Sequence, residues 1–217
     1  MVLNKISEQL AALSPEPLQP TEGSREAAVL LAFTRQADPQ LVFTQRAQHM
    51  NSHPGQVAFP GGKWERSDSS LLFTALRESQ EEVALAPSEV EMIAQLPQRR
   101  TRLGVQVTPY LGFIRPNLAL RADPSELEAI FHVPLSYLLE PRHLIKKQVD
   151  VLGHYCWMPC YHYQGYTIWG FTLAVLVDML NRVFAVGLNA EVDKADLPLD
   201  IRQRFPQFPE GEAPGTL

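Results

Sequence analysis

Hydrophobic and polar residues alternate in short blocks along this chain, and the period of each block predicts an element. Blocks rich in Val, Leu and Phe and bounded by turn residues predict strands at 26–34, 41–44, 56–59, 90–96 and 107–114. Helical spacing of apolar residues predicts helices at 5–13, 69–85, 125–131, 134–139 and 170–182. A hairpin is expected at 154–169, with Gln164-Gly165 at its turn. Strands and helices interleave without strict alternation, so the pattern indicates an α/β chain whose mixed sheet is covered by helices.

The same pattern divides the chain into one main domain with two extensions. We expect an N-terminal helix and a Pro-rich link over residues 1–22, and the main domain over 23–185. Residues 186–217 contain recurring prolines and predict an irregular C-terminal tail.

Composition narrows the class of protein. Apolar residues make up 45 % and charged residues 20 %, which is ordinary for a globular chain. The net charge of −5 argues against a nucleic-acid-binding surface, which needs a basic patch. The most apolar run, 171–177, is far shorter than a membrane span, and two Cys do not make a disulfide framework. We therefore expect a cytoplasmic protein that binds neither nucleic acid nor membrane.

The helix predicted over 69–85 has an apolar stripe and a separate acidic face. At about 100° per residue, the stripe that must face a core consists of Leu72, Ala75, Leu76, Ser79 and Val83. Glu78, Glu81 and Glu82 lie together on the other face, and we expect their carboxylates to face solvent. Three like charges repel one another, and a hard divalent cation removes that repulsion. A plain solvated acidic face is the alternative, because such faces are common.

The turn before this helix favours a binding site. Gly61 and Gly62 end the predicted strand 56–59, and two adjacent glycines allow positive φ and a close approach of the backbone to a ligand. An ordinary loop would also explain paired glycines. A strand, a Gly-Gly turn and a helix bearing Arg-Glu-x-x-Glu-Glu form a much rarer combination.

Residues 62–85 resemble the box of the Nudix hydrolase family, G-x5-E-x7-R-E-U-x-E-E-x-G-U, where U is a bulky aliphatic residue. The stretch Arg77-Glu78-x-x-Glu81-Glu82 matches the core of the box. Asp68 stands where Glu is usual, one extra residue separates it from Arg77, and Ala84 replaces the final Gly. The resemblance extends over about residues 27–180 and implies a Nudix-type α/β/α sandwich with a mixed β-sheet.

The resemblance also implies metal-dependent hydrolysis of a phosphoanhydride bond by water. Glu78, Glu81 and Glu82 would hold Mg²⁺ or Mn²⁺, ions that clamp phosphate oxygens and acidify the attacking water. Arg77 would orient a neighbouring glutamate. The general base is open between Glu82, which we favour, and Glu126, which follows Asp-Pro-Ser at the start of a predicted helix. A first-turn glutamate favoured by the helix dipole is the alternative for Glu126.

A second resemblance concerns the substrate. Coenzyme A diphosphatase-like Nudix proteins carry a pattern close to L-L-T-x-R-[SA]-x3-R-x3-G-x3-F-P-G-G before the box. Residues 42–62 keep every spacing of this pattern, including Arg46, but Asn51 replaces its second Arg. Arg46 is a candidate phosphate clamp, because guanidinium offers a planar fork; a surface arginine is its alternative. The Gly61-Gly62 backbone and Lys63 are further candidate substrate contacts.

Three functions remain open at this stage. The first is hydrolysis of coenzyme A or its acyl derivatives to adenosine 3′,5′-bisphosphate and 4′-phosphopantetheine. The second is a Nudix pyrophosphatase activity on ADP-ribose, dinucleotides or nucleoside triphosphates, and the third is a catalytically silent nucleotide-sensing module. The intact glutamates count against a silent module. We expect a small nucleotide diphosphate as partner, and aromatic residues over 157–169, which typically fill cores or dimer interfaces, leave a homodimer open.

Overall fold

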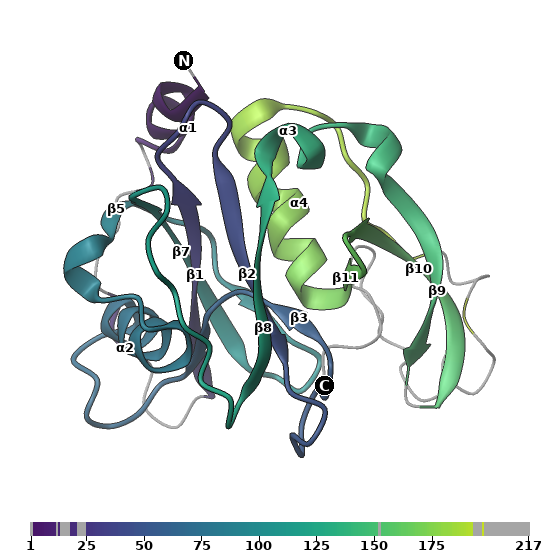
Figure 1. Ribbon diagram of the computed structural model, residues 1–217, viewed down its shortest axis with the longest axis horizontal. Helices are drawn as coiled ribbons and strands as arrows, with labels where there is room; N and C mark the ends of the chain where they lie inside the picture. Colours follow the sequence, from purple (N-terminus) through teal and green to yellow (C-terminus); the bar gives the residue numbers. More distant parts are fainter. Residues whose placement is uncertain are drawn as a thin grey trace. The chain divides into compact units, whose positions relative to one another are not determined.

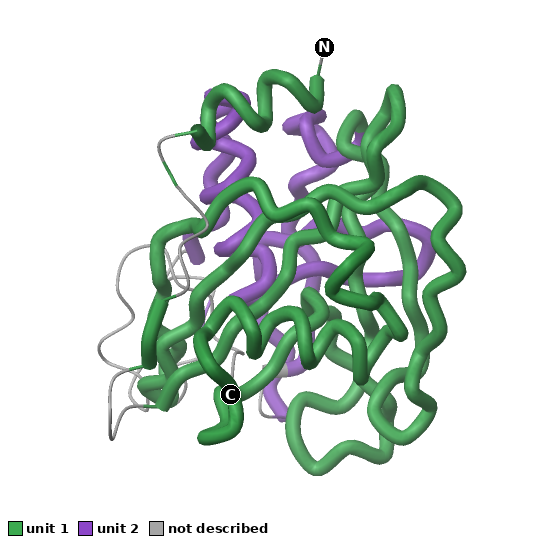
Figure 2. The backbone as a smooth tube through the Cα atoms, turned by 90° about the vertical axis from the view of Figure 1, so that its left-hand side faces the viewer, with its two compact units in different colours: residues 1–136 green, residues 137–217 purple. Residues whose placement is uncertain are grey.

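The computed structural model describes residues 2–11, 13, 18–20, 25–151, 153–192 and 197. The chain divides into two compact units, residues 1–136 and 137–217 (Figure 2). Most of the predicted link within 1–22 and of the predicted tail 186–217 lies outside the described residues. No described helix is long and apolar enough to cross a membrane.

The first unit is built on one mixed sheet. Its described residues form strands β1 (Glu26–Thr34), β2 (Gln40–Arg46), β3 (Val57–Ala58), β4 (Gly61–Lys63), β5 (Glu91–Gln95), β6 (Arg99–Arg100), β7 (Gln106–Ile114) and β8 (Leu127–Pro134). The order is β3-β2-β1-β7-β5, with β4 paired to β1, β6 to β7 and β8 to β2 (Figure 1). β1 and β7 are parallel and the other pairs are antiparallel, which confirms the predicted mixed sheet.

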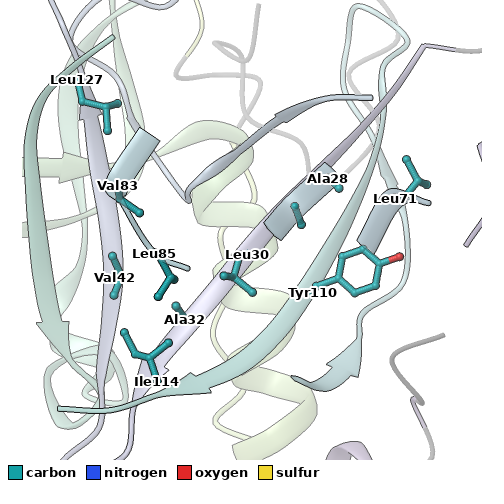
Figure 3. Close-up of a cluster of buried hydrophobic side chains, with 11 residues drawn as sticks. Ala28, Leu30, Ala32, Val42, Leu71, Val83, Leu85, Tyr110, Ile114 and Leu127 are labelled. Carbon is teal, nitrogen blue, oxygen red and sulfur yellow. The ribbon is translucent and has the colours of Figure 1, made fainter. Parts of the chain in front are cut away.

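Helix α2 (Leu71–Val83) covers part of one face of this sheet. Its first turn is capped by Ser70, whose hydroxyl accepts a hydrogen bond from the Phe73 N–H at 3.1 Å. Side chains of α2 and of the central strands form a shared core (Figure 3), which includes Ala28, Leu30, Ala32, Val42, Leu71, Ala75, Val83, Leu85, Tyr110, Ile114 and Leu127. The other α-helices described in this region are α1 (Val2–Leu10) and α3 (Leu135–Leu138), which spans the boundary between the units, and a 3-10 helix covers Pro87–Glu89.

Two predictions about α2 are confirmed only in part. The buried side of the helix consists of Leu71, Thr74, Ala75, Ser79, Glu82 and Val83, while Leu72 and Leu76 are half-buried. The stripe is therefore rotated toward Glu82, whose side chain is buried rather than solvent-facing. The cause is β4, which pairs with β1 beside the helix and offers the Glu82 carboxylate a backbone donor.

The helix predicted at 125–131 is also wrong, because β8 starts at Leu127 and pairs with β2. The residues Asp123-Pro124-Ser125 form a turn instead of a helix start. The Asp123 carboxylate accepts hydrogen bonds from the Ser125 N–H and hydroxyl at 2.9 and 2.7 Å. Phe131 stacks on Phe43 across the strand pair, with ring centroids 5.6 Å apart. Pairing with β2 therefore overrides the local capping signal.

The second unit contains a three-stranded antiparallel sheet and one long helix. The sheet has the order β11-β10-β9 and consists of β9 (Leu144–Val151), β10 (His154–Tyr163) and β11 (Tyr166–Ile168). The predicted hairpin is confirmed, since Gln164 and Gly165 join β10 to β11 with positive φ at both positions. Helix α4 (Gly170–Phe184) confirms the predicted helix at 170–182 and packs against β10. Strand β9 had no counterpart in the sequence prediction.

Candidate active site

The Gly61-Gly62 turn forms a surface on which carboxylates rest directly against the backbone. It lies in β4, which pairs with Ala27–Val29 of β1. Gly61 has φ +148°, and a Cβ at this position would overlap the carbonyl oxygen of Ala28. A Cβ on Gly62 would overlap the carboxylate of Glu78. Gly61 is therefore required by its close approach to a strand backbone, and Gly62 leaves room for the acidic side chain of Glu78.

Glu82 approaches the same turn from the C-terminal half of α2. Its carboxylate is buried, with 5 % of the residue exposed, and accepts a hydrogen bond from the Gly61 N–H at 3.0 Å. Burial raises the pKa of Glu82 to about 8; the Gly61 hydrogen bond works against this shift, and the negative charges of Glu78 and Glu126 add to it. The charged form of the Glu82 carboxylate is therefore unfavourable in this site unless a cation is close.

Glu126 and Arg46 lie near this carboxylate although they are distant in sequence. The loop that carries Glu126 is attached to the end of α2 by a hydrogen bond from the Asp123 N–H to the Glu82 carbonyl at 2.9 Å. The Ala47 N–H, next to Arg46, donates to the Glu126 carbonyl at 2.8 Å. Consistent with this proximity, Glu126 raises the pKa of Glu82 and Arg46 lowers it, after the larger effects of burial and Gly61.

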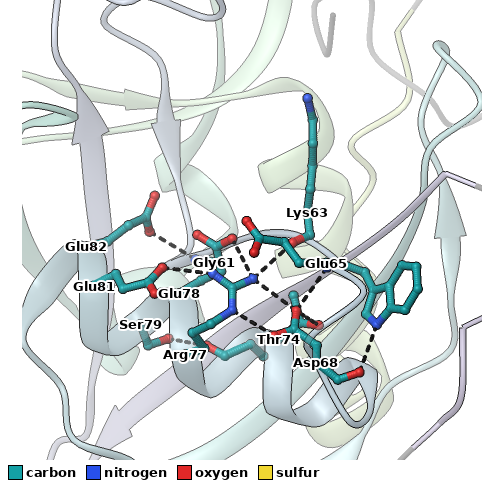
Figure 4. A network of polar contacts seen from close by, with 12 residues as sticks. Gly61, Lys63, Glu65, Asp68, Thr74, Arg77, Glu78, Ser79, Glu81 and Glu82 are labelled. Atoms are coloured by element: carbon teal, nitrogen blue, oxygen red, sulfur yellow. Dashed lines mark hydrogen bonds and ion pairs between the residues drawn. The ribbon is translucent and has the colours of Figure 1, made fainter.

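Arg77 is held by Asp68 from the loop before α2 (Figure 4). The Arg77 Nε and Nη2 atoms donate to the two oxygens of Asp68 at 2.8 and 3.0 Å, so the pair is bidentate. The Asp68 side chain has no exposed surface and also accepts from the Thr74 hydroxyl and the Glu65 N–H. Arg77 Nη2 in turn donates to Glu78 at 3.1 Å. Asp68 therefore fixes the arginine that orients Glu78.

Asp68 is the positioning residue that the sequence reasoning missed. The sequence marked it only as an acid at the position of the family's glutamate. The chain has one residue more between Asp68 and Arg77 than the family pattern, and the shorter side chain of Asp68 still reaches Arg77. The available signal was the presence of an acid at this position of the box.

Glu81 is more exposed than the other two box glutamates. Its carboxylate is 58 % exposed and accepts a hydrogen bond from Arg77 Nη1 at 2.8 Å. Among the residues that the structure describes, no three His, Cys, Asp or Glu side chains are gathered ready to hold a metal ion. Glu78, by contrast, is close enough to Glu82 to raise its pKa, and burial raises the pKa of Glu78 itself. These two carboxylates suit a divalent cation, and Glu81 is the third candidate ligand on the same helix.

Arg46 and Lys63, two of the predicted substrate-binding residues, lie near the same turn. Arg46 Nε donates to the Ser52 carbonyl at 3.2 Å, which brings the loop carrying the exposed Asn51 beside the guanidinium. Lys63 contributes its carbonyl, which accepts from Arg77 at 3.2 Å, while its side chain extends away from the glutamates (Figure 4). The structure therefore brings two arginines, four glutamates and the backbone of two glycines into one region: Arg46, Arg77, Glu78, Glu81, Glu82, Glu126, Gly61 and Gly62.

The chain is similar to known proteins in sequence and in fold. The model of the NUDIX domain family matches residues 24–163. Proteins named "Uncharacterized Nudix hydrolase NudL" from Salmonella newport and Salmonella typhimurium are each 40 % identical over 181 residues, which cover 82 % of this chain and 93 % of the relative. The crystal structure of a MutT/nudix family protein from Enterococcus faecalis is similar in fold, with a TM-score of 0.52 and 19 % identity over 78 % of this chain and 66 % of that chain.

Proposed function

Because the chain belongs to the Nudix hydrolase family, whose members act on phosphoanhydride bonds, we propose that it hydrolyses the diphosphate linkage of coenzyme A or its acyl derivatives. The products would be adenosine 3′,5′-bisphosphate and 4′-phosphopantetheine or its acyl form. One observation carries the choice of site: Glu78 and Glu82 converge on the Gly61-Gly62 backbone, beside Arg46 and Glu126. The spacing of residues 42–62 supports the choice of substrate.

The proposed chemistry is direct attack of water on phosphorus. Mg²⁺ or Mn²⁺ held by Glu78, Glu81 and Glu82 would supply positive charge to the phosphate oxygens and acidify water. We assign the general base to Glu82, because its buried carboxylate would be deprotonated beside a bound cation and could then accept the proton of the attacking water. Glu126 is the alternative base, because it lies close to the Glu82 carboxylate and therefore to the same proposed site. Arg77 orients Glu78, and Arg46 would clamp a phosphate.

A substrate panel with site variants tests the reaction. We expect hydrolysis of coenzyme A with Mg²⁺ or Mn²⁺, with products identified by mass. Glu78→Gln and Glu82→Gln should each lower kcat by at least about 10²-fold, the scale of losing an electrostatic or acid–base group. Glu91→Gln removes an exposed carboxylate on β5 and should leave kcat unchanged. Hydrolysis at the wild-type rate by both site variants would contradict the assignment of the site.

Asn51 offers a test of substrate choice within the site. If the pattern's second arginine contacts a phosphate, this chain lacks one charge-assisted hydrogen bond, which corresponds to roughly 10- to 150-fold in kcat/KM. Asn51→Arg should then raise kcat/KM for coenzyme A more than for ADP-ribose, which lacks the 3′-phosphate and the pantetheine arm.

The matched control for this test is Ser52→Arg, which adds the same charge at the neighbouring exposed position. This control variant should change kcat/KM for coenzyme A and for ADP-ribose by the same factor. An unchanged ratio in the Asn51→Arg variant would mean that Asn51 plays no part in substrate choice. Faster hydrolysis of ADP-ribose or a nucleoside triphosphate than of coenzyme A by the wild-type chain would favour the second function.

A further inference from the structure

Strand β9 (Leu144–Val151) forms the outer edge of the sheet in the second unit. Among the described residues it pairs with β10 alone, and it lies at the margin of the three strands in Figure 1. An edge strand presents a row of N–H and C=O groups that can pair with another strand. At eight residues β9 is long for an edge, where short strands are the usual protection.

One face of β9 is polar and exposed. Lys146, Gln148 and Asp150 alternate along the strand, so their side chains share this face, and all three are exposed. Their partners on β10 are Pro159, Trp157 and Tyr155. Trp157 is 48 % exposed and Tyr155 is 73 % exposed, so large aromatic surface lies beside the polar row. On the opposite face of β9, Lys147 contacts another side chain of the same sheet: its Nζ lies 3.1 Å from His162 Nδ1.

The charges on this face are self-complementary under a twofold axis. When an edge strand pairs antiparallel with its own copy, directly opposite residues must point to the same face of the sheet. The twofold axis must therefore pass midway between one residue and the same residue of the copy. An axis at Gln148 places Lys146 opposite Asp150 of the copy, and does so twice. An axis at Lys147 would place two lysines opposite each other, and one at Val149 would place Gln148 opposite Asp150.

We propose that two copies of this chain associate by antiparallel pairing of β9 with β9 about Gln148, which joins two three-stranded sheets into one of six strands. The interface is isologous, because the same residues serve both partners. Lysines on an edge ordinarily prevent pairing with other chains. Here Asp150 of a second copy would lie opposite Lys146 and neutralise its charge. The lysine therefore does not prevent pairing with a second copy of this chain in this register. This inference concerns the second unit and is independent of the proposed function.

Charge reversal provides the first test, measured as molar mass by sedimentation equilibrium. The wild-type chain should be a dimer. Lys146→Glu and Asp150→Lys each convert two attractive pairs into repulsive ones, so each variant should dissociate with a Kd raised by about tenfold or more. The two variants mixed should associate, because each then meets the opposite charge. The double variant Lys146→Glu/Asp150→Lys should again be a dimer.

Glu140→Lys is the matched control, since it reverses an exposed charge of the second unit outside β9. It should leave the wild-type mass unchanged, and circular dichroism should show all variants folded. A wild-type chain that is monomeric at every concentration would overturn the proposal. So would a dimer that persists in both single variants, because its interface would lie elsewhere.

A cross-link tests the register directly. Gln148→Cys places two thiols opposite each other across the axis, with Cα atoms about 4.5–5.5 Å apart, within reach of a disulfide. Lys146→Cys places its two thiols about 13 Å apart along the strands, beyond that reach. Under mild oxidant the first variant should form a covalent dimer and the second should not. The native Cys156 and Cys160 are buried thiols that are not joined in a disulfide. Equal cross-linking of the two variants would contradict the register.

Discussion

At the scale of single residues, Asp68 decides how the box arginine is held. It has no exposed side-chain surface, yet four hydrogen bonds reach its carboxylate from Arg77, Thr74 and the Glu65 N–H. Burial alone would raise the pKa of Asp68, but the hydrogen bonds from Arg77, Glu65 and Thr74 outweigh it and lower the pKa below its ordinary value. The aspartate therefore stays charged and keeps Arg77 beside Glu78.

Replacing Asp68 by Asn should destabilise the protein in a pH-dependent way. At pH 7 the free energy of unfolding should fall by about 1.5–3 kcal/mol, the range for hydrogen bonds to charged groups. Because the folded-state pKa is below that of the unfolded chain, this contribution is complete above the unfolded value and is lost as pH falls through the folded value. The difference between variant and wild type should thus narrow below about pH 4.

Urea unfolding at pH 7 and pH 3 measures that difference. Glu128→Gln, at an exposed position of β8, serves as the control and should differ little from wild type at pH 7. A difference for Asp68→Asn that stays constant between the two pH values would show that the carboxylate charge does not carry the stabilisation.

At the scale of elements, the end of α2 explains one departure from the family pattern. Ala84 follows the last helical residue with φ 56° and ψ 30°, the left-handed conformation, and its N–H donates back to the Gln80 carbonyl at 3.1 Å. Glycine adopts this conformation without steric cost, whereas a residue with a Cβ does not. The family's glycine at this position therefore reflects the helix end, and this chain tolerates alanine there at some loss of stability.

Ala84→Gly should raise the free energy of unfolding by about 0.5–1 kcal/mol, because relief of strain exceeds the added freedom of the unfolded chain. Ala86, at φ −63° and ψ 139°, provides the matched control: glycine there should lower stability by about 0.4–1 kcal/mol. Thermal unfolding of both variants measures the two effects. Loss of stability in both variants would show that the cap of α2 carries no strain.

At the scale of the whole molecule, every residue proposed for catalysis belongs to the first of the two compact units. A divalent cation bound by the box glutamates should therefore stabilise that unit most, since a ligand stabilises the state that binds it. Hydrogen exchange with and without Mn²⁺ should show the largest gain of protection at 61–63 and 71–83, and a smaller gain at 144–168.

The Glu82→Gln variant should lose most of that Mn²⁺-dependent protection while keeping the exchange pattern of the metal-free wild type. Equal protection of both units by Mn²⁺, or protection that survives in the variant, would place the cation away from the box glutamates.

Local patterns in the sequence were sufficient for the elements that carry the site. The apolar block of β1 predicted its bounds at 26–34, and the periodicity with Arg-Glu-x-x-Glu-Glu predicted α2 and the glutamates on it. The turn at Gln164-Gly165 likewise predicted the hairpin of β10 and β11. Such features depend on residues within a turn or two of one another, so propensity, spacing and turn chemistry specify them without the rest of the chain.

Only the tertiary structure decided which of these residues meet. Strand β8 replaced a predicted helix because pairing with β2 and stacking of Phe131 on Phe43 outweigh a local capping signal. Glu82 is buried because β4 supplies a donor from twenty-one residues away, and Arg46 and Glu126 adjoin it through two loop hydrogen bonds. Burial and long-range pairing depend on residues remote in sequence, and no local period records them.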